Sequence, residues 1–160
     1  MEQAKAMKSY KYKHGVTLVE ILVVVAIIAL LASMVISIAA RINNQSKERC
    51  LECTCALLEC ALQEYHEYWK VFPDPNQPPY LSRSAALYGQ LHSTPSSRKI
   101  LEEVSDSSIQ NNPNAVDMPQ IYDPWGTVLD YRYVPGDNFP ELVSAGPDKI
   151  FGTADDISNR

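Results

Sequence analysis

The chain has 160 residues, of which 46% are hydrophobic, and a formal net charge of −5. Its first fifteen residues hold four lysines against one glutamate, a net of +3, so the remainder carries −8. This acidic remainder argues against a nucleic-acid-binding protein, because the basic footprint of such proteins is absent. The length fits about one domain plus a segment outside it.

Residues 16–40 form a long apolar segment in which Glu20 is the one charged residue. From Ile21 to Ala40 the chain has no charge, and as a helix these residues span about 30 Å, the thickness of a bilayer core. The segment is too long for the apolar core of an ordinary secretory signal. The lysines before it predict a cytoplasmic N-terminus by the positive-inside rule, although three basic residues also follow the segment.

The next segment, residues 41–72, continues the helix as an amphipathic one. Neither proline nor glycine occurs between Val16 and Phe72, so the sequence predicts a single helix of up to 57 residues. Beyond the apolar span, apolar residues recur at alternating steps of four and three, which indicates a face packed against a folded head. These residues are Leu51, Cys55, Leu58, Leu62, Tyr65, Trp69 and Phe72. Pro73 is expected to end the helix.

Residues 73–160 are expected to form a globular head of mixed structure. Short helices are predicted over 82–91 and 96–104, the second starting at Ser96, and strands over 127–134 and 141–145. Two or three antiparallel strands laid on the long helix would close a small core. The predicted fold class is therefore α+β, a long N-terminal helix packed on a small antiparallel-sheet head.

The sequence HGVTLVEILVVVAIIALLAS, residues 14–33, resembles the N-terminal signature of type IV prepilins and type II secretion pseudopilins. The resemblance implies that residues 1–15 are a leader, which a prepilin peptidase removes by cleavage between Gly15 and Val16. Val16 would then be the N-methylated first residue, although the family usually has Phe there. The same resemblance implies a pilin-like fold with residues 16–40 in the membrane or in a filament core.

Glu20 can also be interpreted from physical chemistry. A carboxylate inside a membrane span costs about 2.5–3.5 kcal/mol on insertion scales, so it is a functional candidate by default. Cleavage after Gly15 creates an α-amine on Val16, and such an amine from a neighbouring subunit could offset the charge of Glu20. The family's proposed role for this glutamate is the same. The alternative is a glutamate at the membrane interface that points its carboxylate toward water.

Two motifs in the head resemble the major, or G-type, pseudopilin of type II secretion: YDPWG, residues 122–126, and SAGPDKIFGTADDI, residues 144–157. The resemblance implies a structural calcium site. Calcium prefers six to eight oxygen ligands, which carboxylates and backbone carbonyls can supply. The candidate ligands are Asp148, Asp155 and Asp156, with Asp130 and Asp137 as further candidates outside the loop. Gly146 and Gly152 give the loop its backbone freedom; the alternative is a solvated acidic turn.

The four cysteines, Cys50, Cys53, Cys55 and Cys60, lie within eleven residues of the long helix. At 100° per residue, Cys55 joins the stripe that faces the head, whereas the other three share a different face. We interpret them as small packing residues, some of which touch neighbouring subunits. Disulfides, either Cys50–Cys53 or between subunits, and a metal site are the alternatives.

The sequence shows no pattern typical of a catalytic nucleophile, a metalloprotease or a phosphate-binding loop, so we do not expect an enzyme. The resemblance implies a structural subunit of a type II secretion pseudopilus in the inner membrane, with a periplasmic head. Its expected partners are prepilin peptidase, identical and minor pilin-like subunits and an inner-membrane assembly platform. The alternatives are a type IV pilus or competence pilin, or a signal-anchored monomeric binding module.

Overall fold

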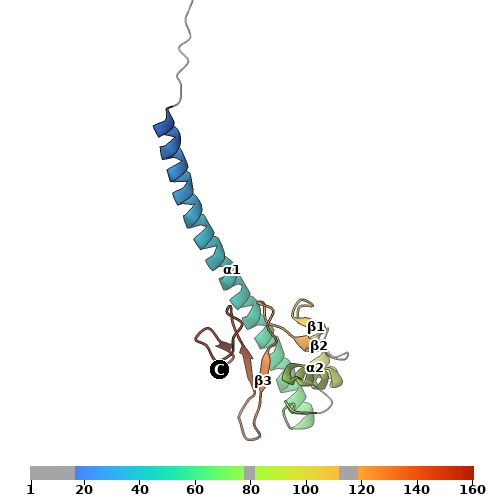
Figure 1. Ribbon diagram of the computed structural model, residues 1–160. Helices are drawn as coiled ribbons and strands as arrows, with labels where there is room; N and C mark the ends of the chain where they lie inside the picture. The colour runs from blue at the N-terminus through green and yellow to red at the C-terminus, as the bar shows by residue number, and fades with distance from the viewer. Residues whose placement is uncertain (1–16, 78–81, 112–118) are drawn as a thin grey trace, which may run out of the picture. The chain divides into compact units, whose positions relative to one another are not determined.

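The computed structural model describes residues 17–77, 82–111 and 119–160 (Figure 1). The leader, Gly15 and Val16 lie outside the described residues. The chain divides into two compact units, Met1–Arg41 and Ile42–Arg160. Helix α1, Leu18–Trp69, runs through both units as one helix of 52 residues, which confirms the predicted continuous helix and places its end three residues before Phe72.

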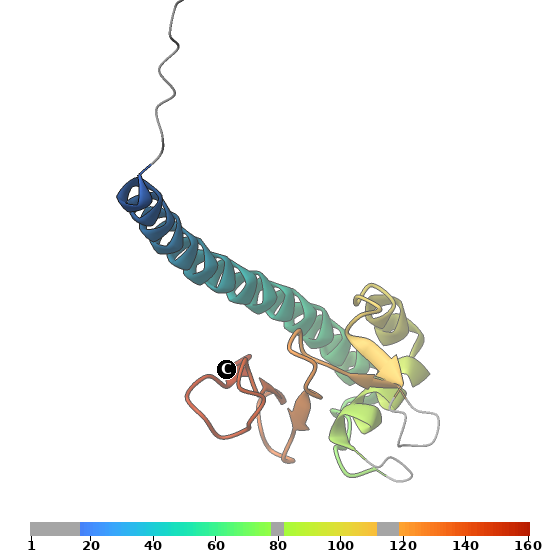
Figure 2. The same ribbon diagram turned by 45° about the horizontal axis from the view of Figure 1, so that its top comes forward.

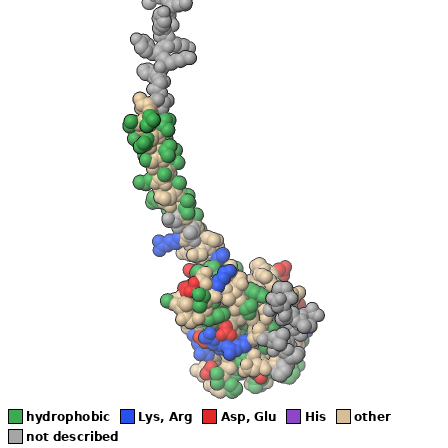
Figure 3. Space-filling view, viewed as in Figure 1, with side chains coloured by type: hydrophobic (Ala, Val, Ile, Leu, Met, Phe, Trp, Pro, Cys, Tyr) green, Lys and Arg blue, Asp and Glu red, His purple; other side chains and the backbone are tan. Residues whose placement is uncertain are grey.

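The part of α1 in the first unit exposes its apolar side chains on all sides. Every large apolar side chain from Leu18 to Ile38 is 48–81% exposed, and Figure 3 shows hydrophobic side chains along this part of the helix. Among the described residues, α1 is the one helix long and apolar enough to cross a membrane. A surface of this kind is stable only when lipid or other protein covers it.

In the second unit, the predicted stripe of α1 packs against the head. Leu51, Leu58, Leu62 and Tyr65 are buried, as their spacing predicts. The prediction is wrong for Trp69, which is 53% exposed because it occupies the last turn of the helix. Its indole N–H donates a hydrogen bond of 3.0 Å to the hydroxyl of Thr94, so the ring lies over the rim of the core.

Helix α1 ends in a left-handed residue. Lys70 has a φ of 61° and its amide donates to the carbonyl of His66 at 2.7 Å, which closes the last turn. Phe72, predicted to be the last residue of the stripe, lies beyond the helix and is half-buried. It contacts the rings of Phe139 and Tyr133, with centroids 5.2 and 5.3 Å apart.

Two short helices follow. Helix α2, Arg83–Ser93, confirms the prediction over 82–91, and the side chain of Ser82 caps it by accepting from the amide of Ala85 at 3.1 Å. Helix α3, Pro95–Leu101, does not begin at Ser96 as predicted and ends three residues earlier. Pro95 is its first residue, since a proline needs no hydrogen-bond partner for its nitrogen at a helix start.

The strands form two small antiparallel sheets. Strands β1, Ile109–Asn111, and β2, Pro119–Ile121, make a pair that the sequence analysis did not predict. Strands β3, Asp130–Arg132, β4, Glu141–Ser144, and β5, Ile157–Ser158, form the second sheet in the order β3-β4-β5. Strand β3 occupies only three of the residues in the predicted strand 127–134. Strand β4 matches the predicted strand 141–145 except for its last residue.

Within the second unit, both sheets lie near the head end of α1 (Figures 1 and 2), and they adjoin each other, since the Leu129 amide donates to the Ile121 carbonyl at 2.9 Å. Side chains from α1, α2 and both sheets share one core. At its centre the fully buried Tyr131 donates its hydroxyl to the carbonyl of Pro73 at 2.9 Å, and burial raises the pKa of this tyrosine. The α+β, pilin-like prediction is confirmed.

Candidate functional site

The first candidate site is the start of α1, where Thr17 and Glu20 bond to each other. The Glu20 amide donates to the Thr17 hydroxyl at 3.2 Å, and the Thr17 amide donates to the Glu20 carboxylate at 3.4 Å. This reciprocal pair is a capping box, which satisfies two backbone donors at the helix start. This role was not among the predictions from the sequence, although the spacing Thr-x-x-Glu indicates it.

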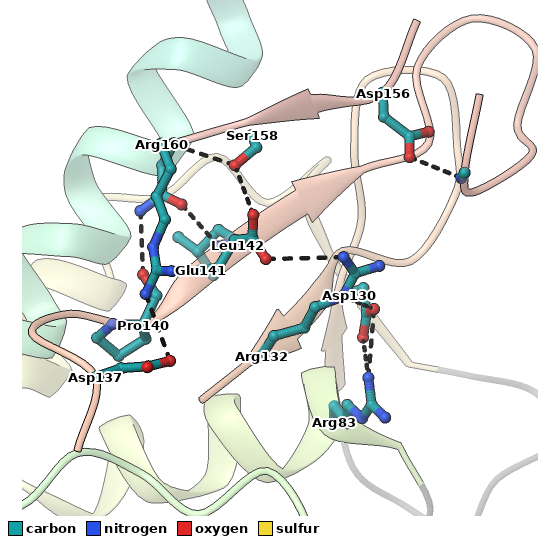
Figure 4. Close-up of polar contacts among 12 residues, drawn as sticks. Arg83, Asp130, Arg132, Asp137, Pro140, Glu141, Leu142, Asp156, Ser158 and Arg160 are labelled. Carbon is teal, nitrogen blue, oxygen red and sulfur yellow. Dashed lines mark hydrogen bonds and ion pairs between the residues drawn. The ribbon is translucent and has the colours of Figure 1, made fainter. Parts of the chain in front are cut away.

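The second candidate site is the acidic loop between β4 and β5. The carboxylate of Asp155 accepts from the Thr153 hydroxyl at 2.6 Å and from the Asp148 amide at 3.1 Å. These two donors hold the pKa of Asp155 below its ordinary value, the Thr153 hydroxyl having the larger effect. The carboxylate of Asp156 accepts from the Gly152 amide at 2.7 Å (Figure 4). Hydrogen bonds to the carboxylates of Asp155 and Asp156 therefore stabilise the conformation of the loop.

Gly146 is the point at which the loop closes most tightly. It is buried, has a φ of 64°, and a Cβ built on it would lie 2.2 Å from the carbonyl oxygen of Asp155. No side chain fits at that distance. Position 146 therefore requires glycine for two separate reasons. Its backbone is left-handed, and the opposite arm of the loop leaves no room for a Cβ.

A buried carboxylate connects the acidic loop to the YDPWG turn. Asp123 is 4% exposed and accepts from the amides of Trp125 at 3.0 Å and Thr127 at 2.8 Å. Its second oxygen accepts from the hydroxyl of Ser144 at 2.6 Å. The Ser144 oxygen in turn accepts from the amide of Gly146 at 3.1 Å. The two motifs are therefore parts of one hydrogen-bonded unit.

The far end of the loop is fastened to α1. Asn159 donates its side-chain amide to the Glu59 carboxylate at 2.9 Å, and its side-chain oxygen accepts from the Leu142 amide at 2.8 Å. Residues 100 positions apart are thus joined by one side chain. The loop leaves from β4 beside Asp123 and returns through β5 to the long helix.

The donor set of the loop fits calcium in part. Among the described residues, no three side chains of the His, Cys, Asp and Glu types gather closely enough to hold a metal by themselves, so backbone carbonyls would have to complete a site. One oxygen of Asp156 is buried and has no hydrogen-bond partner within residues 17–77, 82–111 and 119–160, so it is an acceptor available to a cation. The backbone carbonyl of Asp155 lies against Gly146.

The two candidates outside the loop have other partners. Asp130 forms ion pairs with Arg83 at 3.1 Å and Arg132 at 2.7 Å, and Arg132 also approaches Glu141 at 3.7 Å (Figure 4). Asp137 pairs with Arg160 at 3.7 Å. Both carboxylates are therefore neutralised by arginines of the head, and the acidic loop retains Asp148, Asp155 and Asp156 as its own candidates.

All four cysteines are free thiols. Cys50, Cys53 and Cys60 are exposed, and Cys55 is half-buried, as the helical spacing predicts. Burial, with a smaller effect of the Glu59 carboxylate, raises the pKa of Cys55 to about 11. Cys55 is thus a packing residue, whereas the described part of the chain leaves the other three side chains exposed.

Comparison with known proteins adds two findings. The Prokaryotic N-terminal methylation motif matches residues 10–36. The Type II secretion system core protein G of Escherichia coli (strain K12) is 32% identical over an alignment 163 residues long, which covers 96% of this chain and 94% of the relative. This chain belongs to the G-type pseudopilins. No solved structure matches it.

Family membership gives the structural findings a common context. The methylation motif contains the Thr17–Glu20 capping box and most of the exposed apolar part of α1. The similarity to core protein G extends through the head, where Asp123 and Ser144 join the two motifs. Asp123 was not predicted as a functional residue, because its three donors come together only in the fold.

Proposed function

We propose that this pseudopilin is a structural subunit of a type II secretion pseudopilus, polymerised through α1 to drive protein export. The observation that carries the proposal is the exposed apolar surface from Leu18 to Ile38 within a prepilin-type methylation motif. Lipid covers such a surface before assembly, and other helices of the same kind cover it afterwards. A folded head on the same chain then remains outside the helical core.

Cleavage between Gly15 and Val16 by prepilin peptidase, followed by N-methylation of Val16, prepares the subunit. The new α-amine is four residues from Glu20, within one turn of the helix start. The Glu20 carboxylate then has two roles, to cap its own helix through Thr17 and to attract the amine of a neighbouring copy. The second role fixes the axial stagger between adjacent subunits.

Before assembly the chain is a single-pass protein of the inner membrane with a cytoplasmic N-terminus and a periplasmic head. The basic leader favours this orientation. Its partners are the peptidase, identical copies, minor pilin-like subunits and the inner-membrane assembly platform. In this role the chain is the substrate of an enzyme and has no catalytic activity of its own.

The acidic loop takes a structural calcium ion in this proposal. Asp148, Asp155 and Asp156 supply the carboxylates, and backbone carbonyls of the loop complete the oxygen set. When bound, calcium supplies the positive charge that offsets carboxylates on both arms of the loop. The buried oxygen of Asp156 that has no hydrogen-bond partner among the described residues supports this assignment.

The calcium proposal is tested on the full chain in detergent by thermal unfolding with calcium and with a chelator. We expect a higher Tm in calcium, and the shift should disappear in Asp156→Asn. Asp106→Asn, an exposed aspartate outside the loop, is the matched control and should keep the full shift. If the Tm is the same in calcium, magnesium and chelator, the loop binds no calcium and is a solvated acidic turn.

The polymer proposal is tested by co-expression with the peptidase and the assembly platform, followed by electron microscopy of sheared material. We expect filaments from the wild-type chain and, from Gly15→Ala, an unprocessed protein that stays in the membrane. Processed wild-type protein that forms no filaments would instead favour a membrane-anchored binding module. If the filaments support export but form no surface pili, the chain builds a pseudopilus and not a pilus.

A further inference from the structure

Three of the four cysteines share a side of α1 that the head leaves open. Cys50, Cys53 and Cys60 are exposed, and Leu57, which lies between them, is half-buried. Steps of three, four and three residues place these four side chains in one row along the helix. We call this row, Cys50, Cys53, Leu57 and Cys60, the thiol face.

The three cysteines of the thiol face are exposed in a single copy, whereas Leu57 packs in part against the core. The buried row of α1, which contains Leu51, Leu58 and Leu62, points about a third of a turn away at 100° per residue, and it packs on the head. Cysteine is among the residue types most often buried in proteins, so three exposed cysteines on one helix call for an explanation. Packing within the chain does not supply one.

The composition of the thiol face suits contact with another helix. The segment around it is rich in charge, but between Cys50 and Cys60 the charged residues, Glu52 and Glu59, point away from the three exposed cysteines. The face is therefore uncharged over these three turns, and Arg49 and Glu64 bound it at its two ends. Thiols are small and weakly polar, which lets a second helix approach closely and cover them at little desolvation cost. Ile42, which is 61% exposed, and Ser46 precede Cys50 at steps of four residues.

We propose that the thiol face is a contact surface for α1 of a second copy of this chain. The inference rests on the proposed function, in which identical copies pack side by side through this helix. It extends that function by assigning the contact to the head-proximal turns of α1 and to particular side chains. The occupant is a second copy because the uncharged row lies on the helix through which the copies assemble, and it begins at the exposed Ile42.

Maleimide labelling tests this contact on assembled filaments and on the same chain dispersed in detergent. Both samples are first reduced with a phosphine, and labelled peptides are identified by mass spectrometry. We expect Cys50, Cys53 and Cys60 to label in detergent and to lose labelling in filaments. A thiol introduced by Glu103→Cys, at an exposed head position outside α1, provides the reference and should label in both samples.

A matched pair of substitutions tests the same contact by assembly. Because Cys53 is exposed in the single chain, Cys53→Arg should leave leader cleavage and the Tm of the head unchanged, yet abolish filaments by burying an unpaired charge. Cys53→Ser, which keeps the small size, should assemble normally. Filaments of normal yield from Cys53→Arg, or equal labelling of the three thiols in both samples, would overturn the inference while the polymer proposal stands.

If the processed wild-type chain forms no filaments at all, the polymer proposal fails and this inference fails with it. The two failures are therefore distinguishable. Absence of filaments rejects both, whereas filaments with freely reactive thiols reject only the contact.

Discussion

Asp123 gives the sharpest prediction about the head, because one buried carboxylate connects two motifs that are distant in the sequence. Substitution by alanine removes the acceptor of the Trp125 amide, the Thr127 amide and the Ser144 hydroxyl. Trp125 and Ser144 are buried, so at least two donors lose their partner where water has little access. Each buried unpaired donor costs about 1–3 kcal/mol, which gives a loss of about 2–6 kcal/mol in unfolding free energy.

That loss is a large part of the 5–15 kcal/mol typical of a domain. We therefore expect Asp123→Ala to lower the Tm of the full chain in detergent by about 10 °C or more. Asp123→Asn keeps one acceptor oxygen for the two amides and replaces the other by a donor opposite Ser144. It should lose only about 1 kcal/mol, since the Ser144 hydroxyl can turn to accept.

Thermal unfolding followed by circular dichroism, with chelator present throughout, measures both variants without any contribution from calcium. Asp106→Ala, at an exposed position of the head, is the control and should unfold with the wild type. The reasoning is refuted if Asp123→Ala also unfolds within a degree or two of the wild type. If Asp123→Asn is as unstable as Asp123→Ala, the negative charge of Asp123 contributes more to stability than its three hydrogen bonds.

Three further predictions concern the helix start, the loop and the thiols. Glu20→Gln retains a capping-box acceptor but loses the charge, so it should be cleaved and inserted normally yet fail to form filaments, and Glu20→Ala should fail in the same way. Filaments from the Gln variant would show that capping alone is required. Gly146→Ala should lower the Tm more than Gly152→Ala, because both have positive φ but only Gly146 meets a carbonyl; equal losses on thermal unfolding would contradict that contact. At pH 8 in detergent, Cys55 should label with maleimide about 100-fold more slowly than Cys53, because a pKa of about 11 leaves little thiolate; equal rates would refute the burial of this thiol.

The long helix could be predicted from the sequence because its signals are local and strong. The absence of proline and glycine from Val16 to Phe72 and the spacing of Leu51, Leu58 and Leu62 depend on neighbours within a few turns. The prediction failed at Trp69, where the periodicity continues but the head covers the side chain only in part. Periodicity shows which residues share a face, not how far a partner extends along it.

The head was harder to predict because its structure depends on contacts between distant residues. Pro95 begins α3 while the hydroxyl of Thr94 accepts from Trp69, a partner 25 positions away. The three-residue strands β1 and β2 are too short to show a period. Asp123 is the clearest case, since its partner Ser144 lies 21 residues away and reaches it only through the sheet.

Intact-mass analysis of the membrane-extracted protein, co-expressed with an active prepilin peptidase, tests the central claim most directly. We predict a mature chain that begins at Val16 and carries one added methyl group, while Gly15→Ala keeps the full-length mass. A wild-type chain that retains residues 1–15 beside an active peptidase would contradict the account. It would mean that the exposed apolar helix is a permanent anchor and not the core of a filament.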